Sequence, residues 1–148
     1  MSIDPDVRLA GSGDHADVLA LDLDLRRSVD GQRGGEAWLV EHPPLNIVGV
    51  PELCWVALVD DVVVGFLAGS LNDDARGHVM SVDRVYVHPS ARELGFGDAL
   101  LAACMTEATK RMCVALEATA LPGDRETKNL YERAGITARS ITLSRRLK

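Results

Sequence analysis

The sequence predicts an α/β fold in which a mixed sheet is flanked by helices. Three strand-like segments follow one another in the middle of the chain, and helical and strand-like segments alternate after them. A run of strands followed by such alternation is typical of a sheet that carries helices on its faces. The chain has 148 residues, of which 47% are apolar and 26% charged, so we expect one globular domain over residues 1–148.

The first third of the chain contains a short strand, a long helix and an irregular connection. We expect the strand over residues 7–12 and the helix over residues 13–31, where apolar residues recur at helical spacing. The apolar face of this helix holds Val18, Leu21 and Leu25. Residues 36–42 are expected to form a helical turn, and the proline-rich stretch over residues 42–53 an irregular connection.

Three consecutive strands are predicted next. The first two cover residues 54–61 and 62–72, and Asp60 and Asp61 form a tight turn between them. The third strand covers residues 79–87 and ends before Pro89, which has no N–H group to continue a ladder.

The last part of the chain alternates helices and strands. A helix begins near Gly97, and a continuous apolar run over residues 113–121 predicts a buried strand. A second helix is expected over residues 124–135, and residues 136–147 are expected to close the chain as a strand. Together these segments predict a central sheet of six to seven strands with about four helices.

Charge and composition exclude several classes of function. The net charge of −6 argues against nucleic-acid binding, and no apolar run is long enough to cross a membrane. The N-terminus lacks the features of a signal peptide, and the three cysteines show no metal-binding spacing, so we expect a cytoplasmic protein without a metal. Residues 1–78 hold 14 acidic against 5 basic residues, a balance of −9. This balance indicates either a cationic ligand in that half or acidic side chains that only solvate exposed loops and helix faces.

One junction between a strand and a helix carries two glycines, in the pattern Arg92-x-x-Gly95-x-Gly97. The free N–H groups at the start of a helix bind anions, and glycine allows close approach of the backbone. A dinucleotide-binding fold would need a third glycine where Leu100 stands, and a P-loop would need Lys where Asp98 stands.

This pattern resembles the R/Q-x-x-G-x-G/A signature of the GNAT superfamily of N-acetyltransferases. It follows a strand that ends in Val87-His88-Pro89, and about thirty residues later "NLYERAGI" resembles the family's second motif, "LYEKxGF". The resemblance covers roughly residues 55–136. It implies the GNAT fold and the transfer of an acetyl group from acetyl-CoA to a primary amine, by direct attack on the thioester in a ternary complex.

The resemblance also implies which residues contact the cosubstrate. A bulge in the strand before the glycines would expose the backbone of Val85 and Val87 to the pantetheine arm. The pyrophosphate would lie against the loop and first helical turn formed by Arg92, Glu93, Leu94, Gly95, Phe96, Gly97 and Asp98. Asp124 stands where the family often has Asn, and it would either contact the pantetheine or cap its helix. Tyr131 matches the family's general acid, which protonates the departing thiolate.

The general base is less determined by the sequence. Asp83 lies on the same strand face as Val85 and Val87 by period-two alternation, and some family members use a carboxylate near this position. A charge at a splayed strand or in an ion pair is an equally good interpretation of Asp83. His78 and Glu117 are weaker candidates.

The sequence does not determine which amine accepts the acetyl group, or whether the protein catalyses the transfer at all. The family usually builds its acceptor site from the segment corresponding to residues 25–52, where Trp38 and, beyond it, Trp55 either line a pocket or fill the core. We expect the acceptor to be a small-molecule or peptide amine. The sequence leaves the oligomeric state open, and a homodimer is one possibility. The alternatives are an enzyme for a longer acyl-CoA and a non-catalytic acyl-CoA-binding or sensing module of the same fold.

Overall fold

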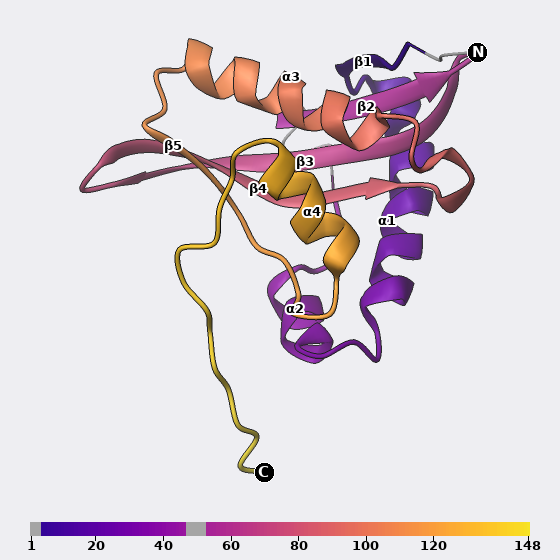
Figure 1. Cartoon of the computed structure of the whole chain (residues 1–148). Coiled ribbons are helices and arrows are strands. Elements are labelled where there is room, and N and C mark those ends of the chain that lie inside the picture. Colours follow the sequence, from indigo (N-terminus) through magenta and orange to yellow (C-terminus); the bar gives the residue numbers. More distant parts are fainter. Residues whose placement is uncertain (1–3, 47–52) are drawn as a thin grey trace.

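A five-stranded sheet forms the centre of the structure (Figure 1). The computed structural model describes residues 4–46 and 53–148. Within them the strand order is β1-β2-β3-β4-β5, and only the pairing of β4 with β5 is parallel. The strands are β1 (Asp6–Leu9), β2 (Cys54–Val59), β3 (Val62–Asp74), β4 (Gly77–Val87) and β5 (Ala115–Ala118).

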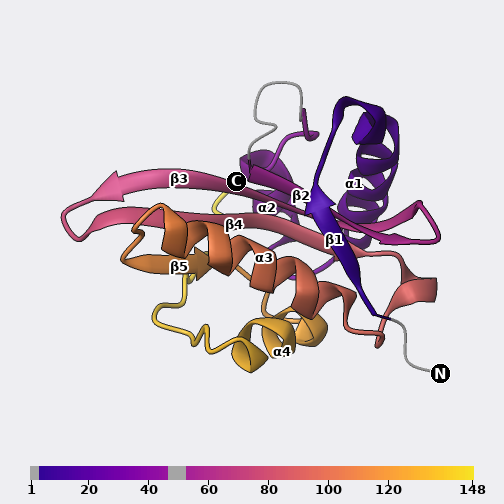
Figure 2. The ribbon, with the colours of Figure 1, turned by 90° about the horizontal axis from the view of Figure 1, so that it is seen from above.

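Helices cover both faces of the sheet (Figure 2). They are α1 (His15–Val29), α2 (Gly35–Glu41), α3 (Phe96–Lys110) and α4 (Arg125–Arg133). The helix α1 packs on one face around Val18, Val56 and Phe66, and α3 and α4 pack on the other face around Leu67, Leu100 and Leu130. The sheet therefore has a hydrophobic core on each side, as the predicted fold class requires.

Most predicted elements are confirmed. The tight turn between β2 and β3 is formed by Asp60 and Asp61, whose φ angles of 48° and 65° both lie in the left-handed region. Two positive φ angles are typical of the type I′ turn, whose twist matches that of a hairpin. The 42–53 connection lies partly outside the described residues.

Two strand predictions are wrong. The segment 113–121 forms only the four-residue β5, which is half-buried because it lies at the edge of the sheet. The segment 136–147 forms no strand, and its apolar side chains Ile141 and Leu143 are 81% and 89% exposed. A strand needs a neighbour for its N–H and C=O groups. No such neighbour pairs with this segment in the described chain, so the sheet has five strands rather than six to seven.

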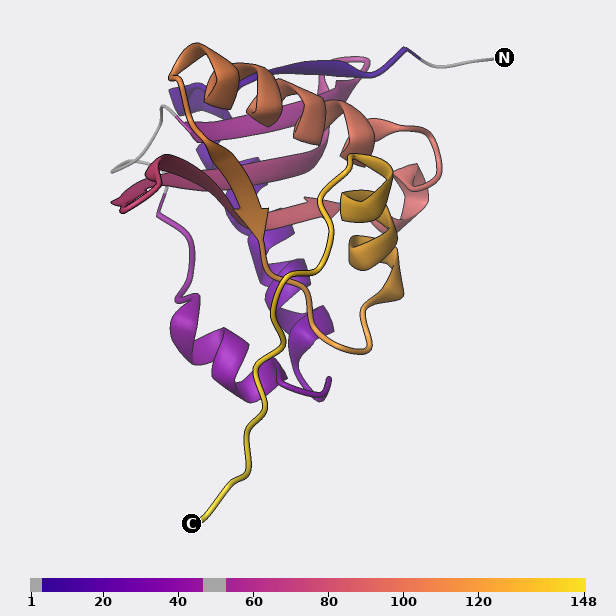
Figure 3. The same cartoon turned by 60° about the vertical axis from the view of Figure 1, so that its left-hand side comes forward.

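The strand β4 is irregular at the position that matters for the site. On one side, residues 79–82 pair with β5, and the pairing stops there, so residues 83–87 have no partner strand on that side among the described residues. On the other side, Ala68 pairs with Arg84 and Gly69 with Val82, which leaves Asp83 without a partner. An extra residue of this kind is a β-bulge and bends its strand. The expected splay of β4 from β5 is thus confirmed (Figure 3).

Candidate active site

A pocket lies where β4 leaves β5. Its lining includes five candidate residues that the sequence singled out, which come from four separate parts of the chain: Trp38 from α2, Asp83 and Val85 from β4, Asp124 from the turn before α4, and Tyr131 from α4. The splay of the strands brings them together, because β5 would otherwise cover this part of β4. Both predicted catalytic residues therefore border the same space.

Tyr131 presents a hydroxyl without a protein partner to this region. The residue is only 6% exposed, and no hydrogen bond joins its hydroxyl to another described residue. Burial, followed by the negative charge of Asp124, raises the pKa of Tyr131 well above that of free tyrosine. The hydroxyl is consequently protonated at neutral pH and available as a proton donor.

Asp83 is a half-buried carboxylate beside the same pocket. It accepts a hydrogen bond of 3.1 Å from the Ser70 hydroxyl on β3. Burial raises the pKa of Asp83, and this effect exceeds the opposing effects of the Ser70 hydrogen bond and of nearby His42 and Arg84. A raised pKa makes a carboxylate a stronger base, which suits proton abstraction.

The two weaker base candidates do not fit the role. Arg76 and Arg139 donate to Glu117 at 3.1 Å and 2.7 Å, and these hydrogen bonds lower the pKa of Glu117 to about 2. His78 pairs with Asp73 at the exposed end of the β3–β4 hairpin. Neither residue lines the pocket at the splay.

The loop after β4 leads into α3 with its first N–H groups free. Pro89, Ser90 and Ala91 form a short 3-10 turn, and then Glu93 and Gly95 both take positive φ angles, of 66° and 87°. Among the described residues, nothing accepts from the N–H groups of residues 96–98, whereas the N–H of Ala99 donates to Gly95. These groups carry the positive end of the helix dipole and can bind an anion.

The two glycines serve different needs in the structure. Gly95 adopts the left-handed conformation that glycine tolerates best. A Cβ on Gly97 would lie 3.3 Å from Leu130, so glycine here lets α3 approach α4 closely. The sequence argument had assigned both glycines to close approach of a ligand, and the packing role of Gly97 was missed.

The remaining predicted cosubstrate residues lie around this loop. Arg92 uses its side chain inside the protein: its Nε donates to the Val87 carbonyl at 3.0 Å, and its guanidinium lies 5.3 Å from the centre of the Tyr86 ring. Leu94 and Glu93 are exposed, and Asp98 pairs with Arg133 at 3.1 Å.

The side chains of Val85 and Val87 pack against the core under α3, which leaves their backbone as the feature that faces the splay. Asp124 accepts from the Thr127 N–H at 3.1 Å, so it caps α4 and also lines the pocket. Both interpretations of Asp124 therefore stay compatible with the geometry.

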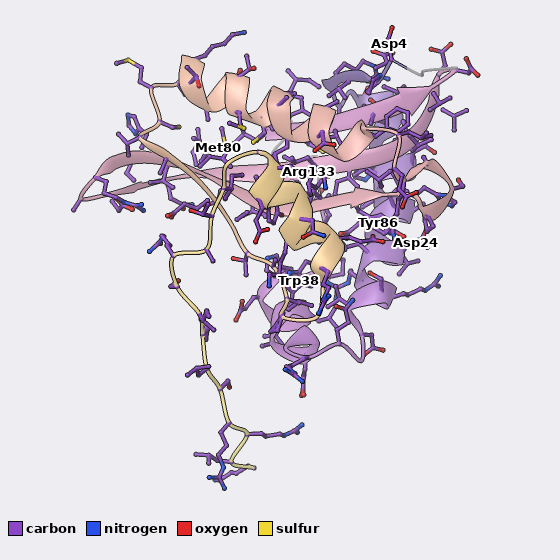
Figure 4. All side chains as sticks on the ribbon, viewed as in Figure 1. Asp4, Asp24, Trp38, Met80, Tyr86 and Arg133 are labelled. Carbon is purple, nitrogen blue, oxygen red and sulfur yellow. The ribbon has the colours of Figure 1, made fainter. Side chains whose placement is uncertain are left out.

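The α1 side of the site holds one predicted pocket residue and one buried pair that the sequence analysis missed. Of the two tryptophans that the sequence offered, Trp38 lines the pocket and stacks on His42, with ring centres 4.1 Å apart, while Trp55 belongs to the core under α3 (Figure 4 labels Trp38 on α2). Arg84, one residue after Asp83, is 8% exposed and pairs with the buried Asp22 at 2.7 Å. Only the unusual positions of Asp22 and Arg84 on otherwise apolar faces could have indicated this pair.

No cluster of three or more His, Cys, Asp or Glu side chains among the described residues could hold a metal ion. No described helix is both long and apolar enough to cross a membrane.

Comparisons with known proteins identify the family and the fold. The sequence matches the acetyltransferase (GNAT) family over residues 23–136. The fold is similar to that of AAC(6')-Iy in complex with a bisubstrate analogue, CoA-S-monomethyl-acetylneamine, with a TM-score of 0.73, 19% identity and 99% of each chain covered.

It is also similar to ribosomal-protein-alanine N-acetyltransferase from Brucella melitensis biovar Abortus 2308, with a TM-score of 0.73 and 19% identity over 98% of this chain and 100% of that one. No curated protein matches the chain in sequence. At these identities the similar structures establish the fold alone.

Proposed function

Because the chain belongs to the acetyltransferase (GNAT) family, we propose that it transfers an acetyl group from acetyl-CoA to a primary amine in a ternary complex. The observation that carries this proposal is the shared pocket of Asp83 and Tyr131, at the place where β4 has no partner strand on the β5 side within the described sheet. A base and an acid on either side of one space are what an amine and a departing thiolate require.

Two backbone features support binding of acetyl-CoA. The free edge of β4 over residues 83–87 can pair with the amide groups of a pantetheine arm, as a sheet edge pairs with an added strand. The free N–H groups of residues 96–98 suit the pyrophosphate. We therefore propose for Val85, Val87 and the segment from Arg92 to Asp98 the roles that the family resemblance implies.

The proposed chemistry needs one proton acceptor and one proton donor. The amine nitrogen forms a bond to the acetyl carbon while the carbon–sulfur bond breaks, so the products are an amide and coenzyme A. Asp83, directly or through water, takes the proton that the ammonium must lose. Tyr131 gives its hydroxyl proton to the thiolate, and this step is uphill because burial has raised the pKa of the phenol. The attacking nitrogen loses a second proton as the amide forms, and this proton restores the Tyr131 hydroxyl.

We propose further that the acceptor is cationic. Residues 1–78, which include α1 and α2, carry a balance of −9, so the half of the chain that contributes these two helices is acidic overall. The positive charge of Arg84 is paired with Asp22, so Asp83 is left to face a ligand ammonium. A matched pair of amines tests this directly: 1,4-diaminobutane should have a higher kcat/KM than 4-aminobutan-1-ol, which replaces the second ammonium by a hydroxyl.

The experiment that tests the function is thiol release from acetyl-CoA with polyamines, aminoglycosides, amino acids and N-terminal peptides. Amine-dependent release, with a mass increase of one acetyl group on the amine, supports the proposal. If acetyl-CoA raises the Tm but no amine is acetylated, the non-catalytic binding module replaces it. Release with a longer acyl-CoA only would keep the transferase and change the donor.

A further inference from the structure

A buried ion pair lies beside the proposed site without a role in the proton transfers. Asp22 on α1 is 2% exposed and Arg84 on β4 is 8% exposed, and Arg84 Nη1 donates to Asp22 Oδ1 at 2.7 Å. A buried ion pair is weak evidence for stability, because desolvation of the two charges offsets their attraction. We therefore asked what else the pair holds in place.

Both members of the pair bind the backbone of the same irregular segment. The second guanidinium nitrogen of Arg84 donates to the Pro43 carbonyl at 2.8 Å, and the Leu45 N–H donates to Asp22 Oδ2 at 2.9 Å. Arg26 adds a third tether by donating to the His42 carbonyl. Pro43 and Pro44 have no N–H groups, so this segment has little backbone hydrogen bonding of its own and depends on these side chains.

The tethered segment forms one wall of a second pocket. The pocket has a volume of about 120 Å³, and its lining includes Leu45 from the segment, Ser70 from β3, and Asp83 and Arg84 from β4. Asp83 thus borders both this pocket and the one that contains Tyr131. An amine that gives its proton to Asp83 while it attacks near Tyr131 would have its remaining atoms within reach of this wall.

We propose that Asp22 and Arg84 are positioning residues for the acceptor amine: together they fix the backbone of residues 42–45 against β4, and so set the distance between this wall and Asp83. The inference rests on the proposed transferase function. It assigns the pair an effect on the acceptor rather than on acetyl-CoA, because the side-chain hydrogen bonds of the pair go to Pro43 and Leu45 and none goes to the loop and helix start over residues 92–98. Arg84 also belongs to the β4 edge proposed for the pantetheine arm, but it would contribute only its backbone there, and a side-chain substitution keeps that backbone.

A double variant, Asp22→Leu with Arg84→Met, separates positioning from stability. Apolar residues of similar volume can replace a buried ion pair without loss of stability, so the variant should fold. It removes the tethers to Pro43 and Leu45 together. We expect the KM for the amine that the wild type acetylates fastest to rise about tenfold, while the Kd for acetyl-CoA changes less than about twofold. Hydrogen exchange at the Leu45 amide should become faster to a similar extent.

Two further variants serve as controls. Arg84→Lys keeps the charge but has no planar fork to reach Asp22 and Pro43 together, so it should also raise the amine KM. Arg8→Lys makes the same substitution in the Arg8–Asp14 pair at the opposite edge of the sheet, where the ion pair measures 2.6 Å, and should leave the amine KM unchanged.

Each outcome decides the proposal. An unchanged amine KM in the double variant, with faster exchange at Leu45, would overturn the positioning role. Equal changes in the amine KM and the acetyl-CoA Kd would also overturn it, because they would indicate general damage. A wild type that acetylates no amine removes the proposed function itself and this inference with it, and that result is distinct because it appears before any variant is compared.

Discussion

Asp83→Asn should lower activity and raise stability at the same time. The substitution removes the proposed proton acceptor, and general acid–base groups contribute rate factors of roughly 10² to 10⁴. It also removes a carboxylate whose ionised form is disfavoured by burial, since burial raises the pKa of Asp83. Loss of activity with a gain in stability is the combination expected of a residue retained for function.

The pH dependence of this gain has a definite sign. Below the unfolded-state pKa of aspartate, about 3.9, Asp83 is protonated in both states and its ionisation costs nothing. As the pH rises through the raised folded-state pKa, the wild type loses stability relative to the variant, and the difference is constant above that pH. Because Asp83 is only half-buried, we expect a difference of no more than about 1 kcal/mol, or a Tm difference of about 2–4 °C.

Thermal unfolding of both proteins between pH 4 and pH 8 measures this difference, and steady-state kinetics at a fixed concentration of free amine measure the activity. A variant that is less stable than the wild type at pH 7 would refute the reasoning, because the Ser70 hydrogen bond would then outweigh the desolvation of Asp83. Unchanged kinetics would remove Asp83 from the mechanism.

Two other predictions concern stability. In Gly35→Ala the new Cβ would lie 2.2 Å from the Val29 carbonyl oxygen, so the variant should lose about 3 kcal/mol in the free energy of unfolding. The control Gly13→Ala has nothing within 4 Å of its new Cβ and should lose far less. Equal denaturant midpoints for the two variants would contradict the close packing of Gly35 against Val29. Removal of residues 138–148 should lower the free energy of unfolding by less than about 1 kcal/mol, because the segment is exposed and its contacts are surface ion pairs such as the one between Arg139 and Glu117. Loss of cooperative unfolding in the truncated protein would instead show that the segment packs on the sheet.

The sequence predicted the elements better than it predicted their pairing. Helical spacing and period-two alternation located α1, α3, α4 and the three consecutive strands, because both patterns reflect burial of one face. The alternating segment after Gly135 has the same local pattern, but a strand also needs a partner edge. Local periodicity carries no information about that partner, so the closing strand was predicted and is not formed.

Local periodicity also failed to predict the irregular part of β4 at the site. Met80 and Val82 face the core under α3, and so does Val85, although strict alternation would place Val85 on the other face from Val82. The bulge at Asp83 shifts the alternation by one residue. A bulge depends on the pairing of two strands, so only the family resemblance indicated it. Neither local periodicity nor the family resemblance could pair Asp22 with Arg84, because the two residues lie 62 positions apart in the sequence.

The central claim is that acetyl transfer takes place where β4 leaves β5, with Tyr131 as the proton donor. The chain has one other tyrosine, Tyr86, which lies on the opposite face of the sheet in the core under α1 (Figure 4). Tyr131→Phe and Tyr86→Phe therefore each remove one phenolic hydroxyl, on opposite faces of the sheet.

The most direct test compares kcat for coenzyme A release by these two variants, at saturating acetyl-CoA and with the amine that the wild type acetylates fastest. Tyr131→Phe should remain folded, because no hydrogen bond joins the Tyr131 hydroxyl to another described residue, and its kcat should fall by about 100-fold or more. Tyr86→Phe, which keeps the ring beneath Arg92, should stay within about threefold of the wild type. Equal kcat values for the two variants would contradict the account.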